Sequence, residues 1–344
     1  MKENKLKRRL KISAVVLTVL ILAGLYLSYM YFDIEPHESY NISDRPSENH
    51  SVVYFTHDIS SEGLMRIYEV LDAHPEGNVA IKLSTGEAGN PNHLSPDLIK
   101  ELVQSVDGTI IECNTAYSGS KRADTAMHLE VAKEHGFTDI ADVDIMDADG
   151  YIKIPVEGGE HLTENWVGKN FQDYDYVIVL SHFKGHPMGG FGGALKNISI
   201  GIASREGKTR IHSGGRLKTP PITFAAITTN QDVFTESMAE AAKSISDYED
   251  HGKNIIYISV MNHMSVDCDC VSDPAEVDMH DIGILASTDP VALDQACVDL
   301  VFKAEDGRSL QHRILRQNGL HILTHAEAIG LGNRSYELID IDGE

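Results

Sequence analysis

Short apolar runs alternate with amphipathic segments along most of this 344-residue chain, and this alternation restricts the fold more than any other feature. Such alternation predicts an α/β domain with a mostly parallel sheet and helices on both faces. The expected helices carry apolar faces at Leu64, Ile67, Val70 and Leu71 and at Leu98, Leu102 and Val106, and a more polar helix covers 121–135. The expected strands are 51–56, 79–83, 109–112, 143–146, 176–180, 255–260 and 282–286.

The overall charge excludes one class of partner. The chain has 29 Lys and Arg residues against 52 Asp and Glu residues, which gives a net charge of −23. Nucleic-acid binding requires basic surface, so we expect no nucleic acid as a partner. The chain has only 4 cysteines and no C-x-x-C-x-x-C run, which excludes a disulfide-dense scaffold and a ferredoxin module.

The N-terminus has the pattern of a membrane anchor. Residues 1–11 are basic, and Ile12–Phe32 runs for 21 residues without a charge. As a helix this segment would be about 31 Å long, close to the thickness of a bilayer core. The basic flank predicts that residues 1–11 stay in the cytoplasm and that the body is extracytoplasmic. A cleaved signal peptide is the main alternative, although no A-x-A-like site follows, and a buried core helix is the third.

We therefore expect a cytoplasmic flank (1–11), a single-pass transmembrane anchor (12–32), a polar tether (33–50) and an extracytoplasmic α/β domain (51–344). Polar loops follow each predicted strand of this domain. Ligands of open parallel sheets bind at the carboxyl edge of the strands, so a functional site is expected there.

The richest of these loops covers residues 181–197. Its candidate catalytic residues are His182, His186 and Lys184, as acid–base groups or as groups that hold an anion. A flexible hinge with solvated histidines is the alternative reading. Glycines let backbone N–H groups approach a ligand closely. The candidate cofactor-binding or anion-binding residues of the loop are Gly189, Gly190, Gly192, Gly193, Lys196 and Asn197, to which His212 is added.

A second candidate site is the Cys268-Asp269-Cys270 triplet. Alternate residues of an extended chain point to the same side, so two thiolates could bind zinc or iron, with His263 or an aspartate completing the shell. A disulfide and two free thiols are the alternatives. Cys297 follows helical spacing and is expected in the core, whereas Cys113 ends a strand and fits either the core or the site. Asp289 precedes Pro290, which is typical of a helix N-cap.

These segments resemble the domain of unknown function 362 family, whose members are often labelled uncharacterised iron–sulfur-centre proteins. The resemblance covers roughly residues 51–341 and is carried above all by the block from His182 to Asn197. Many relatives carry a cysteine-rich, ferredoxin-like insert after the position of His212. This chain has only residues 213–221 at that place, so no iron–sulfur cluster is expected. The other similar segments are 79–83, 200–205 with 207, 208 and 212, 268–270, 281–287 with 289–292, and 330–332.

Two functions follow from these patterns. The first is a membrane-anchored extracytoplasmic enzyme that uses a metal ion or a cofactor and acts on a small anionic substrate. The alternative is a non-enzymatic metal- or cofactor-binding module in surface redox or metal handling. An enzyme requires an enclosed cleft that joins the glycine-rich loop to Cys268 and Cys270. We expect His182, His186, Lys196, Cys268 and Cys270 to converge on one pocket.

The first prediction concerns the anchor. Full-length protein produced in a bacterial host should stay in the membrane fraction with residues 1–32 attached, because the 21-residue uncharged segment lacks a cleavage site. Fractionation followed by N-terminal sequencing measures this. A mature protein that begins near residue 33 and is found in the medium would show that the segment is a cleaved signal.

Overall fold

The computed structural model of this chain describes residue 40 and residues 50–343. The predicted flank and anchor (1–32), and the tether apart from residues 40 and 50, lie outside the described residues. In the described part, no helix is both long enough and apolar enough to cross a bilayer.

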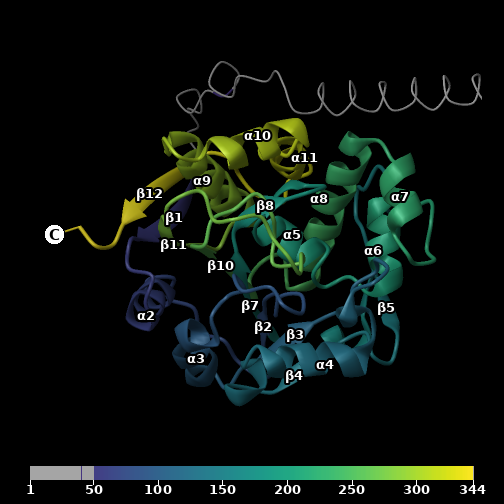
Figure 1. Cartoon of the computed structure of the whole chain (residues 1–344), viewed down its shortest axis with the longest axis horizontal. Coiled ribbons are helices and arrows are strands. Elements are labelled where there is room, and N and C mark those ends of the chain that lie inside the picture. The colour runs from purple at the N-terminus through teal and green to yellow at the C-terminus, as the bar shows by residue number, and fades with distance from the viewer. Residues whose placement is uncertain (1–39, 41–49, 344) are drawn as a thin grey trace, which may run out of the picture. The chain divides into compact units, whose positions relative to one another are not determined.

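The described residues form an eight-stranded sheet in the order β12-β1-β11-β10-β7-β2-β3-β4 (Figure 1). Among these strands only β11 runs antiparallel to its neighbours. The seven strands predicted from the sequence are present, and the mostly parallel α/β fold is confirmed. The edge strand β12 was not predicted. The bounds are β1 (Ser51–Thr56), β2 (Val79–Lys82), β3 (Thr109–Glu112), β4 (Val143–Ile145), β7 (Tyr176–His182), β10 (Ile255–Met261), β11 (Gly283–Ser287) and β12 (Tyr336–Asp340).

Helices lie around the sheet (Figure 1). The α-helices are α2 (Ser61–Glu69), α3 (Pro96–Ser105), α4 (Thr125–Glu134), α5 (Ala194–Ser199), α6 (Arg205–His212), α7 (Thr223–Thr228), α8 (Gln231–Tyr248), α9 (Pro290–Lys303), α10 (Arg308–Arg316) and α11 (His321–Ala328). The 3-10 turns are η2 (Lys121–Ala123), η3 (Phe137–Asp139) and η4 (Lys169–Asp173). The polar helix expected over 121–135 is divided at Asp124, whose carboxylate caps α4 by accepting the Met127 N–H.

The sheet has an apolar core on one face and further helices on the other. Ile256 and Ile258 of β10 belong to a cluster with Leu64 of α2 and Leu102 of α3. Successive residues of a strand point to opposite faces. Ser259 of β10 therefore faces the other side of the sheet, where α9 contacts the strand.

The glycine-rich loop is not a flexible hinge. It forms an antiparallel hairpin of β8 (Lys184–His186) and β9 (Gly190–Gly192), in which Lys184 pairs with Gly192 and His186 with Gly190. A second hairpin consists of β5 (Tyr151–Pro155) and β6 (Glu164–Gly168). The β8–β9 hairpin packs so closely that a β-carbon on Gly185 would lie 2.3 Å from the Val266 carbonyl oxygen.

Asp294 of α9 fixes the end of the hairpin. Its buried carboxylate accepts the N–H groups of Ala194 and Leu195 at 2.7 and 2.9 Å and so caps α5. Burial raises the pKa of Asp294 to about 7. The carboxylate lies against Gly193, where a β-carbon would be 2.1 Å from Asp294 Oδ1.

The second prediction follows from this contact. Gly193→Ala should lower the free energy of unfolding by about 1–3 kcal/mol, because the methyl group forces the pinned carboxylate away from the α5 N–H groups. Urea denaturation measures the effect. Gly343→Ala is the control, since the nearest atom to its β-carbon would be 3.8 Å away. Equal stability of the two variants would contradict this packing.

Candidate functional site

A cavity of about 420 Å³ opens at the carboxyl ends of the central strands, within the size range of small-molecule sites. The polar and ionisable residues in its wall are Lys82, Ser84, Glu112, Cys113, Thr115, Tyr117, Arg122, Ser181, His182, His186, Lys196, Asn197, Lys208, His212, Thr223, Cys268, Asp269 and Cys270. Neighbouring β7 and β10 are parallel, with Ser259 in register with Ser181, so the loops that follow them meet at one edge. The predicted convergence of His182, His186, Lys196, Cys268 and Cys270 on one pocket is confirmed.

The segment after β10 is tied to the sheet through a buried carboxylate. Asp269 bonds to His182 Nδ1 at 2.8 Å and to Lys184 Nζ at 2.9 Å. His182 Nε2 lies 2.9 Å from the Asn262 carbonyl oxygen, and Lys184 Nζ also donates to the Asn92 carbonyl oxygen at 2.6 Å. Burial raises the pKa of Asp269, but the charges and hydrogen bonds of His182 and Lys184 outweigh it and hold the pKa well below its ordinary value.

This arrangement changes the roles predicted for two residues. Both ring nitrogens of His182 have protein partners, so the ring lines the cavity but has no nitrogen free for a substrate. Lys184 is buried and does not line the cavity. It neutralises Asp269, which makes it a supporting residue rather than a catalytic one.

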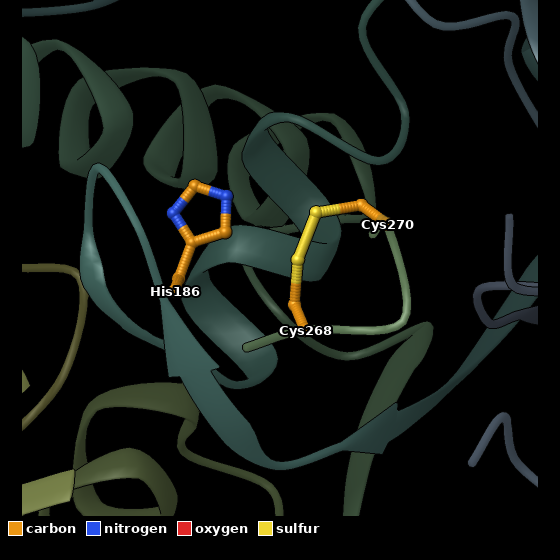
Figure 2. A group of neighbouring side chains, drawn as sticks. All are labelled: His186, Cys268 and Cys270. Atoms are coloured by element: carbon orange, nitrogen blue, oxygen red, sulfur yellow. A yellow bond between two sulfur atoms is a disulfide. The ribbon is translucent and has the colours of Figure 1, made fainter. Parts of the chain in front are cut away.

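His186 lies beside Cys268 and Cys270, which form a disulfide (Figure 2). The two sulfurs and one nitrogen of the ring lie within 4.8 Å of one another. His186 Nδ1 accepts the N–H of Gly189 at 2.8 Å and that of Met188 at 3.3 Å. Burial and the positive charges nearby lower the pKa of His186 well below its ordinary value, so the ring is neutral. Because Nδ1 is an acceptor, Nε2 carries the proton.

These three residues are a potential metal site by distance alone. Thiolates are the cysteine form that binds metals, and a disulfide offers none. A histidine ligand usually donates its second nitrogen to a carbonyl or carboxylate, whereas His186 Nδ1 accepts backbone N–H groups. The donor set therefore does not fit a metal ion while the disulfide is present. His263, the predicted third ligand, is exposed and does not line the cavity.

A buried charge cluster also lines the cavity. Lys82 Nζ lies 3.5 Å from Glu112 Oε2, and Arg122 donates to Glu112 Oε1 at 3.2 Å. Burial raises the pKa of Glu112, but Lys82, His128 and Arg122 together hold it well below its ordinary value. The sequence analysis missed these residues, although a signal was present: Lys82 and Glu112 are charged residues inside runs predicted to be buried strands.

Two further lysines face the cavity without a carboxylate partner. Lys196 and Lys208 line the wall, and neither forms an ion pair within 4 Å in residues 50–343. Lys208 Nζ donates to the Ala203 carbonyl oxygen. Burial, followed by repulsion from Lys82 and Arg122, lowers the pKa of Lys196 to about 8.

The remaining predicted binding residues divide into two groups. His212 lines the cavity, donates Nδ1–H to the Lys208 carbonyl oxygen at 2.6 Å and stacks on Phe234. Burial lowers its pKa to about 4, so it is neutral. Asn197 also lines the cavity, but its amide donates to protein oxygens, including Ser181 Oγ at 3.1 Å.

The four glycines predicted to bind a cofactor or an anion also differ in position. Gly192 and Gly193 line the cavity, whereas Gly189 and Gly190 do not. A β-carbon on Gly190 would lie 2.9 Å from the Gly319 Cα atom, so this glycine permits packing against the segment after α10. Only two of the four predicted glycines are therefore positioned for their backbone to approach a ligand.

The family model described as "Domain of unknown function (DUF362)" matches residues 79–299, more than half of the chain. The chain belongs to this family. The matched span contains the hairpin, the disulfide and every lysine and arginine of the cavity wall. The family membership expected from the sequence is thereby confirmed.

Eight chains of solved structures, including the following two, are similar to this family member, and no curated protein matches it. The lactate racemase apoprotein from Thermoanaerobacterium thermosaccharolyticum is 17% identical, with a TM-score of 0.36, over 63% of this chain and 52% of that chain. A protein from Thermotoga maritima is 14% identical, with a TM-score of 0.38, over 71% of this chain and 58% of that chain. This chain therefore spans little more than half the length of each.

The structure also shows the positions of the two other cysteines and of Asp289. Cys297 is buried on α9, as predicted. Cys113 lines the cavity and donates to the Ile202 carbonyl oxygen at 3.3 Å, and burial raises its pKa well above its ordinary value. Asp289 accepts the N–H groups of Val291 and Ala292, which confirms the N-cap interpretation.

The third prediction tests the buried carboxylate. Asp269→Asn should lower the free energy of unfolding at pH 7 by about 3–5 kcal/mol, because Lys184 and His182 lose the partner that compensates their burial. The pKa of Asp269 is depressed in the folded protein. The stability that it contributes is therefore present above the unfolded pKa of about 3.9 and is lost as the pH falls below it.

Urea denaturation from pH 7 to pH 3 measures both effects. Wild-type stability should fall more steeply with acidification than that of the variant. Asp250→Asn is the control, since Asp250 forms an exposed pair with Lys253 at 2.9 Å, and little change is expected there. A variant as stable as the wild type at pH 7 would refute the role of Asp269.

Proposed function

We propose that this family member is an enzyme that binds and converts a small organic anion in the cavity. The observation that carries the proposal is the pair Lys196 and Lys208, two cations that face the cavity without a carboxylate partner in residues 50–343. They lie in a protein whose net charge is −23. Positive charge gathered in the cavity of an acidic protein favours an anionic ligand.

The wall also has an apolar part. Ala116, Met188, Ile200 and Ile222 line the same cavity as the lysines. A site of this kind binds a carbon skeleton by burial and fixes its orientation through a few polar groups. This combination favours a small carboxylate or organic phosphate over an inorganic ion.

Two side chains of the cavity wall have properties suited to catalysis. Lys196, with a pKa of about 8, exchanges its proton close to neutral pH, where acid–base catalysis is most effective. His186 is neutral and holds a proton on Nε2. We propose Lys196 as the base or anion-binding group and His186 as a hydrogen-bond donor to the substrate. Of the catalytic residues expected from the sequence, the proposal keeps His186.

The proposal includes the location expected from the sequence: a domain anchored by residues 12–32 and held outside the cytoplasm. The uncharged segment and its basic flank support it. A disulfide between Cys268 and Cys270 is typical of proteins outside the reducing cytoplasm.

A non-enzymatic metal-binding module is the second candidate, and the grouping of His186, Cys268 and Cys270 within 4.8 Å favours it. It requires the reduced protein. Under this alternative, the full chain purified anaerobically with reductant would hold stoichiometric zinc or iron by elemental analysis. Under our proposal it holds neither and consumes a small organic anion.

The fourth prediction concerns Lys196. Lys196→Gln should weaken the binding of a dicarboxylate such as malonate about tenfold or more, because a charge-assisted contact in the cavity is lost. Wild-type affinity should fall as the pH rises through about 8, where Lys196 loses its proton. Isothermal titration calorimetry from pH 6.5 to pH 9.5 measures both effects, and NMR of a mixture of small organic acids detects conversion.

Lys153→Gln is the matched control, because Lys153 is half exposed on β5 and pairs with Glu164. It should bind the anion as the wild type does. Equal binding by Lys196→Gln and the wild type would contradict the proposed role. Binding without conversion of any anion in the mixture would favour a binding module over an enzyme.

A further inference from the structure

The disulfide in the cavity wall is poorly suited to a structural role. It joins Cys268 to Cys270, which are only two residues apart in the sequence. A disulfide stabilises a fold mainly by shortening the loop available to the unfolded chain, and this benefit grows with loop length. A loop this short gives the smallest benefit. The bond nevertheless lies in the wall of the cavity, where a solute can reach it.

The segment that carries the two cysteines is held on both sides. The carboxylate of Asp269, between them, is bound by His182 and Lys184. The Asp269 carbonyl oxygen accepts the Glu87 N–H at 2.7 Å, and the Cys270 carbonyl oxygen accepts the Tyr117 hydroxyl at 3.0 Å. None of these contacts involves a sulfur atom. Cleavage of the disulfide would therefore leave two thiols held next to each other.

His186 provides a hydrogen-bond donor at the same place. Its Nδ1 accepts the Gly189 N–H, so the proton of the neutral ring is on Nε2. Figure 2 shows Nε2 on the side of the ring that faces the disulfide. An N–H group beside a disulfide can stabilise the thiolate that leaves when the bond is cleaved.

We propose that Cys268 and Cys270 form a reversible two-electron thiol–disulfide centre that exchanges with a dithiol, with the His186 Nε2–H as hydrogen-bond donor to the leaving thiolate. Cys270 is half-buried and Cys268 is buried, so the attack occurs at Cys270. This inference goes beyond the proposed function and does not depend on the substrate of the cavity.

The exchange balances in two steps. A thiolate of the reductant attacks Cys270 Sγ, and a bond forms between the two sulfurs. The Cys268–Cys270 bond breaks, and its electron pair goes to Cys268 Sγ, which leaves as a thiolate that accepts a hydrogen bond from His186 Nε2–H. The second thiol of the reductant then loses its proton, attacks its own bound sulfur and releases Cys270. The reductant leaves as a disulfide, its two protons end on Cys268 and Cys270 through the solvent, and the protein gains two thiols.

The test uses the full chain, purified without reductant and treated with dithiothreitol in native buffer. Alkylation followed by peptide mass spectrometry should find Cys268 and Cys270 blocked before treatment and labelled after it. Cys297, which is buried and lies outside the cavity, should stay unlabelled. His186→Leu should slow the reduction about tenfold or more, since a hydrogen-bond donor to developing negative charge contributes at least this much to such steps. His325→Leu is the control, a buried histidine on α11 outside the cavity, and should react at the wild-type rate.

A second measurement needs no histidine variant. Reduced wild-type protein should bind one equivalent of phenylarsine oxide, which bridges two adjacent thiols, and Cys270→Ser should bind none. The proposal is overturned if dithiothreitol releases the two thiols only in denaturant, or if the reduced protein binds no arsenical. Reduction of folded His186→Leu at the wild-type rate would equally overturn it.

Discussion

The site depends on one buried ionic contact, the Asp269 carboxylate between His182 and Lys184. His182 ends β7 and Lys184 begins β8, so both partners belong to the chain that leaves the centre of the sheet. Asp269 belongs to the segment that follows β10. A buried carboxylate is costly unless it is paired and hydrogen-bonded, and here each oxygen has a hydrogen-bond partner. The contact therefore fixes the disulfide segment against the hairpin that carries His186.

The charged groups in and around the cavity fall into two sets. In the first, Glu112 neutralises Lys82 and Arg122, and Asp269 neutralises Lys184, so these charges hold the structure together. In the second, Lys196 and Lys208 face the cavity without such a partner among the described residues. Since burial makes charge pairing stronger, these two lysines are the groups with electrostatic attraction to offer a ligand. The disulfide and the His186 N–H add the proposed redox function beside them.

Much of this fold could be predicted from the sequence, because parallel strands buried on both faces appear as continuous apolar runs. The sequence did not predict that β7 and β10 are neighbours in the sheet. Because the carboxyl ends of parallel strands lie at one edge, it nevertheless predicted that His182 and Cys268 would lie close together. Contacts between residues far apart in the sequence could not be predicted. The strand β12, near the end of the chain, pairs with β1, and Asp269 bonds to Lys184, which is 85 residues away. The roles of Lys184 and His263 were misassigned because residue type does not reveal whether a side chain faces a cavity or a buried carboxylate.

The most direct test of a single small-anion site is a crystal structure of the full chain grown with malonate. The account predicts density for the anion inside the cavity, within about 3.2 Å of Lys196 Nζ or Lys208 Nζ. The Cys268–Cys270 pair and His186 should line the same space. An anion bound only on the outer surface, or a cavity in which Cys268 and Cys270 lie more than about 15 Å, or some three strand spacings, from Lys196, would contradict the account.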